Sequence, residues 1–167
     1  MQDSCVRTDP DLDDLDRRLL GLLQRDARRP LHELGDEVGL SPSAVQRRLK
    51  RLRASGVIRA EVAVLDQRAL GVGLGSVVLV ALVDDDPARH AAFRDRLRAE
   101  PAVQQCFGII GQWDYVVLLL SRDIAENREL SAELFGPGTG VHRYETLPAY
   151  ETVKSGLALP LQPPRPR

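Results

Sequence analysis

Apolar residues in the first third of the chain recur at the three- and four-residue spacing that is typical of amphipathic helices. Leucines at this spacing, behind aspartates that suit a helix N-terminus, predict a first helix over about residues 13–27. A second helix is predicted between Pro30, which breaks the chain, and Gly39, which would cap it. A Ser-Pro pair, an N-cap with proline at the first helical position, predicts a third helix over residues 41–54.

Two short apolar stretches follow the third helix. Residues 57–59 and 62–64 predict two brief strands that would form a wing-like hairpin. Glycines then punctuate residues 65–75, which we expect to be a linker, because their spacing is not that of a nucleotide loop and no helix opens from them. Residues 11–64 are therefore predicted to be a winged helix-turn-helix domain.

The rest of the chain alternates strands and helices. It predicts, in chain order, a strand at 76–83, a helix to about residue 99, strands at 103–110 and 115–120, a helix at 124–134 and a strand at 141–147. This β-α-β-β-α-β order is that of the ferredoxin-like fold, an antiparallel sheet whose two helices cover one face. The predicted fold class is therefore α+β, with a second domain over residues 76–157.

Two of the predicted strands are apolar on both of their faces. Residues 77–83 and 116–120 are apolar runs, whereas a strand with one face in water would alternate apolar and polar residues. A large bare apolar surface is usually buried against another copy of the same chain, and two-fold pairing is the commonest arrangement. We therefore expect a homodimer that forms through the uncovered face of this sheet.

Composition is that of a globular protein, with 43% apolar and 28% charged residues. The 23 Lys and Arg residues nearly balance the 24 Asp and Glu residues, so the net charge of −1 points to neither nucleic acid nor a membrane surface. The charge is segregated, however, because residues 41–60 hold six basic residues and no acidic one. This basic stretch covers the predicted third helix.

The predicted third helix has an apolar side and a polar side when it is projected at 100° per residue. Val45, Leu49 and Leu52 share a narrow arc that should face the core, and Arg48 flanks this arc closely enough for a local salt bridge. The side chains expected to contact DNA phosphates and base edges are Ser43, Gln46, Arg47, Lys50 and Arg51. A solvated basic face is the simpler alternative, but the place of the helix as the last of three favours DNA reading.

Several motifs together resemble one family of regulators. Residues 12–64, with a Val-Gly-Leu-Ser-Pro turn at 38–42 and Leu-Arg-Ala-Ser-Gly-Val-Ile at 52–58, resemble the helix-turn-helix of the leucine-responsive regulatory protein/asparagine regulator (Lrp/AsnC) family. The Gly-Gln-Trp-Asp-Tyr stretch at 111–115 resembles the Gly-x-x-Asp-Tyr stretch of that family's effector domain, and residues 146–154 resemble its closing strand. The resemblance covers about residues 11–157.

The resemblance implies a transcription factor that dimerises, often assembles further into octamers, and binds double-stranded DNA and an amino acid. It places a small-molecule effector around Ile109, Gly111, Gln112, Trp113 and Asp114, with a second wall from a neighbouring subunit near Thr146 to Thr152. Backbone N–H groups at the glycine could hold the effector carboxylate, and Asp114 could accept its ammonium group. Without the resemblance, residues 111–114 would be interpreted as an ordinary hairpin turn with a packing tryptophan.

Other classes of function find little support. Two cysteines and three widely spaced histidines predict no metal site, no cofactor and no catalytic residues. Two alternatives remain: an enzyme like the sirohaem decarboxylases, which share this two-domain architecture, and an effector-independent architectural protein that coats DNA. No apolar run is long enough to span a membrane and no secretory signal is evident, so we expect a cytoplasmic protein without a membrane partner. Residues 1–10 and the Pro-rich residues 158–167 are expected to be a disordered leader and tail.

Overall fold

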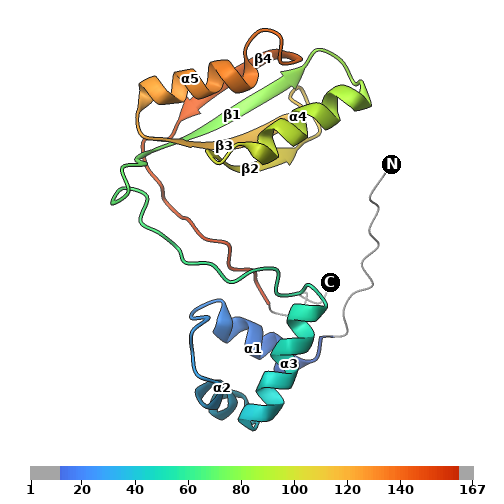
Figure 1. Cartoon of the computed structure of the whole chain (residues 1–167), viewed down its shortest axis with the longest axis vertical. Coiled ribbons are helices and arrows are strands. Elements are labelled where there is room, and N and C mark those ends of the chain that lie inside the picture. Colours follow the sequence, from blue (N-terminus) through green and yellow to red (C-terminus); the bar gives the residue numbers. More distant parts are fainter. Residues whose placement is uncertain (1–11, 162–167) are drawn as a thin grey trace. The chain divides into compact units, whose positions relative to one another are not determined.

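The structure, a computed structural model, describes residues 12–161, which divide into two compact units (Figure 1). The first, the helical unit, contains α1 (Asp14–Leu23), α2 (Leu31–Val38) and α3 (Pro42–Ala54). It ends at Ala63 but includes the chain again from Gly156, whereas the second, the sheet unit, spans Val64–Ser155. The predicted helix-turn-helix is confirmed, although its first helix ends at Leu23 and not at residue 27.

Local sequence determines where the three helices begin and end. Asp13 and Asp16 form a capping box, in which each carboxylate accepts a hydrogen bond from the backbone N–H of the other residue (2.8 and 3.3 Å). Gly39, at φ +73°, adopts the left-handed conformation that ends α2 and turns the chain toward α3. The Ser41 hydroxyl accepts from the N–H of Ala44 (3.3 Å) and caps α3. The apolar sides of the helices then meet in one core of Leu19, Leu20, Leu22, Leu34, Val38, Val45, Leu49 and Leu52.

The prediction of a wing at residues 57–59 and 62–64 is wrong, because neither stretch forms a strand. Ile58 instead turns back onto the helices and packs against their core. Val62 and Val64 are 76% and 96% exposed, so no apolar contact holds the second stretch. A lone two-stranded hairpin is marginal without such a contact.

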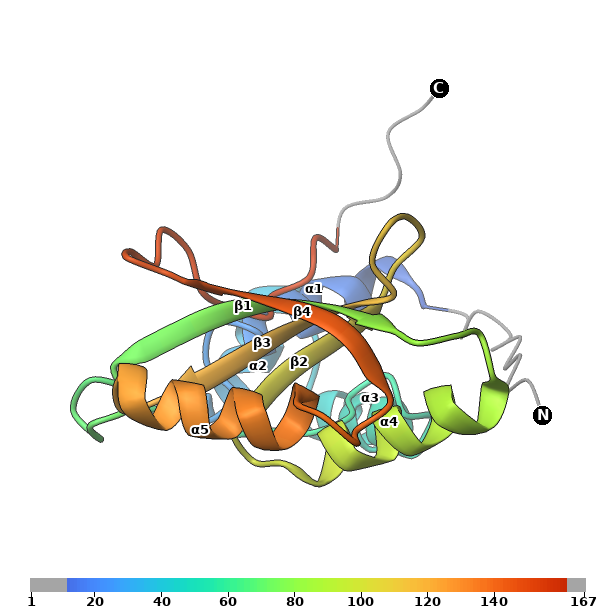
Figure 2. The same cartoon turned by 90° about the horizontal axis from the view of Figure 1, so that it is seen from above.

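The sheet unit confirms the predicted β-α-β-β-α-β order. Its elements are β1 (Leu74–Leu82), α4 (Pro87–Ala99), β2 (Val103–Gly108), β3 (Tyr115–Ser121), α5 (Ile124–Phe135) and β4 (Val141–Pro148). The strands pair antiparallel in the order β2-β3-β1-β4, and both helices lie on the same side of the sheet (Figure 2). β1 begins two residues before the predicted strand, within the expected linker at 65–75. Pro148 ends an edge strand, where the missing N–H does no harm.

The two faces of the sheet differ in what covers them. Alternate residues of β1 and β3, among them Val78, Val80, Val117 and Leu119, are fully buried beneath the helices. The residues between them point to the uncovered face, where register pairs Leu79 with Val116. Other apolar residues on this uncovered face are Val77, Leu118, Phe107 and Leu147. Phe107 and Leu147 are 55% and 45% exposed, so one chain alone leaves an apolar surface in water.

The first residues of the predicted tail belong to the helical unit. Leu161 packs against its core, whereas residues 158–160 are exposed. Leu159 exchanges two hydrogen bonds with the Gln24 side chain. The leader at 1–10 and the rest of the tail, at 162–167, lie outside the described residues.

Two glycines of the helical unit allow a matched stability test. A Cβ atom on Gly35 would overlap the backbone carbonyl oxygen of Leu40, whereas one on Gly21 would lie 3.9 Å from the Leu161 side chain, an ordinary contact. We expect Gly35→Ala to destabilise the helical unit by about 1–3 kcal/mol, because backbone must shift. Gly21→Ala should stabilise it by up to about 1 kcal/mol through helix propensity. Equal effects of the two substitutions in thermal unfolding would contradict this packing.

Candidate nucleic-acid interface and effector site

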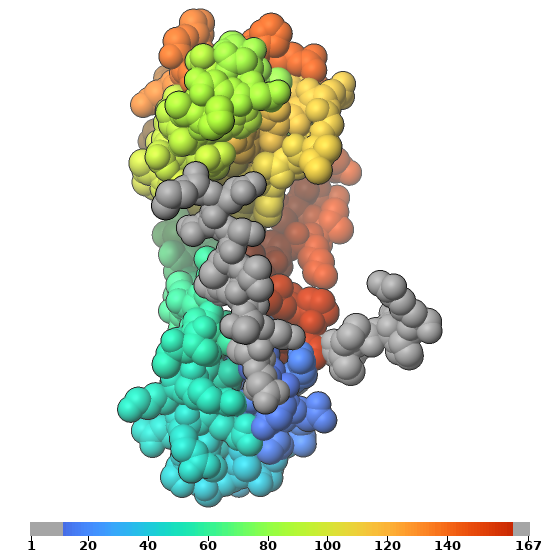
Figure 3. All heavy atoms as spheres, turned by 90° about the vertical axis from the view of Figure 1, so that its right-hand side faces the viewer, coloured from blue at the N-terminus to red at the C-terminus, as the bar shows by residue number. Residues whose placement is uncertain are grey.

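Helix α3 presents opposite faces to the core and to solvent. Val45, Leu49 and Leu52 are at most 2% exposed, as the helical projection predicts. Helix α3 lies at the surface of the helical unit (Figure 3, cyan). All the residues predicted to contact DNA are exposed, namely Ser43, Gln46, Arg47, Lys50 and Arg51. The hydroxyl of Ser43 lies 3.1 Å from that of the capping residue Ser41, which places it beside the N-terminus of the helix.

A buried carboxylate joins α3 to α1. Asp16 is completely buried and pairs with both Arg48, at 2.9 Å, and Arg51. Arg48 also donates to Asp13 at 2.7 Å, so two aspartates of the α1 capping box hold two arginines of α3. Sequence reasoning missed Asp16, and the available signal was an acidic residue within the leucine spacing of the first helix. The cluster fixes how α3 sits on α1.

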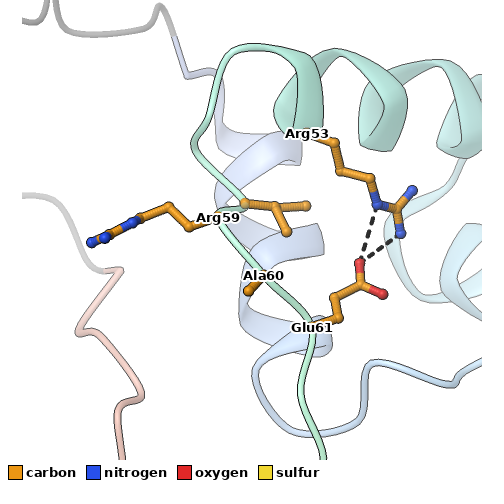
Figure 4. A pocket seen from close by; sticks show the side chains of 5 residues that line it. Arg53, Arg59, Ala60 and Glu61 are labelled. Carbon is orange, nitrogen blue, oxygen red and sulfur yellow. Dashed lines mark hydrogen bonds and ion pairs between the residues drawn. The ribbon is translucent and has the colours of Figure 1, made fainter. Parts of the chain in front are cut away.

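The C-terminal end of α3 carries another ion pair. Arg53 donates to Glu61 through two nitrogens at 3.1 and 2.7 Å, across an open pocket of about 390 Å³ that Ile58 and Ala60 also line. Arg59 lines the same pocket, but its side chain points away from this pair (Figure 4).

Three of the six basic side chains of residues 41–60 therefore form ion pairs within the chain. Arg48, Arg51 and Arg53 each pair with a carboxylate. Within residues 12–161 no ion pair involves the other three cations, Arg47, Lys50 and Arg59. Arg51 has two remaining guanidinium nitrogens and is half exposed, so its pairing does not bury it. On α3 itself, Arg47 and Lys50 are thus the cations that form no ion pair with the described part of the chain.

The candidate effector residues at 109–114 form one exposed turn between β2 and β3. Gly111 has φ +151°, a conformation that a side chain would strain. Asp114 has a structural task there, because its Oδ2 accepts from the N–H of Leu82 at 2.7 Å. Its backbone N–H donates to the carbonyl of Val80 at 2.9 Å, which ties the turn to β1. The second carboxylate oxygen, Oδ1, takes part in no hydrogen bond among the described residues.

An arginine that sequence reasoning missed contacts the turn from β4. Arg143, on β4, places its guanidinium 4.3 Å from the centre of the Trp113 ring. It also donates to the carbonyl of Gln112 at 3.2 Å. Because β4 is far away in sequence, no local pattern could have revealed this contact. The guanidinium of Arg143 thus contacts the same turn that carries the carboxylate of Asp114.

A small polar cluster holds the start of β3 to α4, on the helix-covered face of the sheet. Tyr115 is 4% exposed, and its hydroxyl oxygen lies 2.8 Å from Nδ1 of His90 and accepts from Arg94 at 3.2 Å. Both partners come from α4. The cluster is not a metal site, because no group of three potential metal ligands lies together among the described residues.

The two threonines of the predicted second wall do not join the turn within one chain. Thr146 pairs with Val78, whose side chain lies on the helix-covered side, and it lines a groove of about 340 Å³ beneath α5. Its hydroxyl oxygen is buried without a hydrogen-bond partner in the described structure. Thr152 is exposed in the chain that follows β4. Their proposed role with a neighbouring subunit stays a prediction.

Known proteins share this architecture over nearly the whole chain. Residues 12–53 match the AsnC-type helix-turn-helix domain, and residues 76–159 match the Lrp/AsnC ligand binding domain. The chain is 32% identical over 152 residues to an uncharacterised helix-turn-helix transcriptional regulator of Sinorhizobium fredii (91% of this chain, 90% of that protein). It is 31% identical over 149 residues to the transcriptional regulator AldR of Mycolicibacterium smegmatis (89% and 87%).

A solved structure agrees with these matches. The crystal structure of a transcriptional regulator from Neisseria meningitidis in complex with L-Met has a TM-score of 0.84 and 28% identity, over 90% of this chain and 97% of that one. Fold and matched domains together define a DNA-binding transcriptional regulator with a ligand-binding domain. The chain belongs to the Lrp/AsnC family. Its relatives are transcriptional regulators and not enzymes, so the enzyme alternative is set aside. None of the helices among residues 12–161 is long and apolar enough to cross a membrane.

Acid should weaken the contact between α1 and α3. The backbone N–H of Asp16 and then the Arg48 guanidinium lower the pKa of Asp13 below its ordinary value. Its ionised form therefore stabilises the fold above the unfolded pKa, and this contribution is lost as pH falls through the lower, folded pKa. We expect Asp13→Asn to lower the unfolding temperature at pH 7, and the difference from wild type to shrink below about pH 4. Asp14→Asn, at an exposed position that forms no ion pair with residues 12–161, is the control, and a pH-independent difference for Asp13→Asn would contradict the assignment.

Proposed function

We propose that the protein is a sequence-specific regulator that binds operator DNA through α3 and changes its operator affinity or assembly when an amino acid binds at the sheet unit. The observation that carries the proposal is the exposed face of α3, where Arg47 and Lys50 form no ion pair with any of residues 12–161, whereas Arg48, Arg51 and Arg53 are paired. Cations that no carboxylate neutralises remain available to phosphates. A helix inserted in the major groove reads bases with its exposed side chains.

The exposed face offers two kinds of contact. Arg47 and Lys50 supply charge for phosphates, and an arginine can also pair with guanine. Ser43 and Gln46 are neutral donors and acceptors suited to base edges. Arg51 contributes through the donors that Asp16 leaves free.

The salt dependence of DNA binding tests which cations contact phosphates. We expect Arg47→Ala and Lys50→Ala each to weaken binding to the DNA upstream of the protein's own gene, and to reduce the slope of log K against log salt by about 0.9 per lost contact. Arg53→Ala is the matched control on the same helix, because Glu61 already neutralises Arg53. Fluorescence anisotropy at several salt concentrations measures both quantities.

Two results would count against the proposal. Equal slopes for Arg47→Ala and Arg53→Ala would show that internal pairing does not determine which charges meet DNA. Equal wild-type affinity for the upstream fragment and for a scrambled fragment of the same length would favour an architectural protein over a sequence-specific regulator.

The effector is proposed to be a zwitterionic amino acid at the turn of residues 109–114. The turn carries Asp114, whose Oδ1 could accept an ammonium group, and it is contacted by Arg143 of β4, whose remaining N–H groups could bind a carboxylate. The complex of the Neisseria regulator with L-Met supports an amino acid of this kind. Trp113 and Ile109 supply apolar surface for its side chain, and the second wall would come from Thr146 and Thr152 of a neighbouring subunit.

A thermal-shift screen of the twenty amino acids tests the effector site. An amino acid that raises the unfolding temperature of the wild type should lose this effect on Asp114→Asn. The asparagine oxygen can still accept the Leu82 N–H, so the variant removes the charge and keeps the structural hydrogen bond. Asp85→Asn, at an exposed position outside the turn, should respond like the wild type. Equal stabilisation of Asp114→Asn would remove Asp114 from the site.

The uncovered face of the sheet supports the proposed homodimer, which could assemble further into octamers. Leu79, Val116 and Leu118 form the middle of this face, and Phe107 and Leu147 extend it. Burial of such a surface against a second copy would remove it from water and bring two helical units into one assembly. A two-fold dimer would read paired half-sites about one helical turn of DNA, roughly 10 bp, or a multiple of it apart.

Sedimentation velocity tests this assembly. We expect Leu118→Glu to shift the wild-type dimer or larger assembly toward monomer, because it places a charge in the apolar face. Leu157→Glu, at a residue that is 78% exposed beyond the last strand, should leave the assembly intact. A monomeric wild type, or an unchanged Leu118→Glu variant, would contradict dimerisation through the sheet.

A further inference from the structure

The segment Gly156–Leu161 follows the sheet unit in sequence but belongs to the helical unit in space (Figure 1). The Gln24 side chain, just after α1, binds its backbone in both directions. The Nε2 group donates to the carbonyl of Leu159 at 3.1 Å, and Oε1 accepts from the N–H of Leu159 at 2.5 Å. The amide side chain therefore binds both the N–H and the carbonyl of one residue, Leu159, as a residue of a neighbouring antiparallel strand would.

Apolar packing adds to this recognition. Leu161 packs against the core of the helical unit, whereas Leu159 remains 68% exposed and contributes mainly its backbone. A Cβ atom added to Gly21 would lie 3.9 Å from the Leu161 side chain, which places Leu161 beside α1. The three helices form a small core, and a small domain gains more from one additional leucine than a large one does.

The chain that leads into this segment starts from an attachment to the sheet. The N–H of Ala149 donates to the carbonyl of Gly75 at 2.8 Å, directly after β4 ends at Pro148. β4 also carries Arg143, which contacts the candidate effector turn through Gln112 and Trp113. Between Ala149 and Leu159 the described chain makes no hydrogen bond of its own. Residues 149–161 are therefore attached to the sheet at Ala149 and to the helical unit at Leu159 and Leu161.

We infer that residues 156–161 are a peptide docked on α1 that completes the DNA-binding unit and conveys the state of β4 to it. The contacts follow one another from the effector turn to Arg143 and β4, then along the chain to Gln24 and α1, and finally through Asp16 to α3. The docking stands on its own contacts, whereas the transmission rests on the proposed function. A ligand that changes β4 would then change operator affinity through this second chain connection, beside the linker that precedes β1.

Hydrogen exchange and thermal unfolding of the full chain test the docking without DNA or effector. The amide of Leu159 should be protected in the wild type and lose protection in Gln24→Ala. Leu161→Asp should lower the unfolding temperature of the helical unit by about 4–8 °C, which is the change expected for the loss of one apolar contact in a domain of this size. Leu157→Asp, in the same segment but 78% exposed, should change it little. An unprotected Leu159 amide, or equal effects of the two aspartates, would overturn the docking.

Operator binding with and without an equimolar mixture of the twenty amino acids tests the transmission. The ratio of the two wild-type dissociation constants should fall between about 5 and 150, the usual range for coupled sites. In Leu161→Asp this ratio should approach one, while the mixture still raises the unfolding temperature of the sheet unit. An unchanged ratio would overturn transmission through the segment. A wild-type ratio of one would reject the proposed effector response and transmission with it, and the exchange experiment would still decide the docking.

Discussion

The buried carboxylate of Asp16 is the constraint on which the DNA-binding unit depends. A carboxylate that is completely removed from water is costly unless cations and hydrogen bonds surround it. Its cations come from α3, more than thirty residues later in the chain, and Asp13 shares one of them. In the folded chain, α3 must therefore pack against α1 in the one orientation that brings its arginines to Asp16. This orientation also determines which side chains of α3 face solvent.

The same pairing changes what the charge distribution means. An excess of six positive charges within residues 41–60 predicts a strongly basic surface. In the structure, Arg48, Arg51 and Arg53 already have carboxylate partners, so the stretch holds the fold together as well as facing solvent. Fewer free cations mean weaker nonspecific attraction to DNA, and a larger share of the affinity must then come from contacts with bases. This balance suits a protein that selects an operator.

Spacing in the sequence predicted the three helices and the β-α-β-β-α-β order, because caps, prolines and apolar periodicity act within a few residues. The prediction of a wing was wrong because apolar residues at 57–64 are compatible with strands but do not suffice to form them. A hairpin also needs an apolar contact, and the second stretch has none because Val62 and Val64 are exposed. Gln24 with Leu159 and Arg143 with Trp113 join residues far apart in the sequence, which no local pattern reveals. Resemblance to a family predicted an effector site at residues 109–114, and it did not show that Asp114 holds this turn to β1.

Asp114 holds the turn with one carboxylate oxygen and leaves the other available to a ligand. Its Oδ2 holds the turn to β1, and Arg143 of β4 contacts the same turn at the Gln112 carbonyl. A ligand that binds the remaining atoms of both side chains would change the contacts of two strands at once. β4 continues into the segment that reaches α1, so a small change at the turn has a covalent route to the helical unit. Such a route alters operator affinity only if the ligand binds the two states of the turn with different affinities.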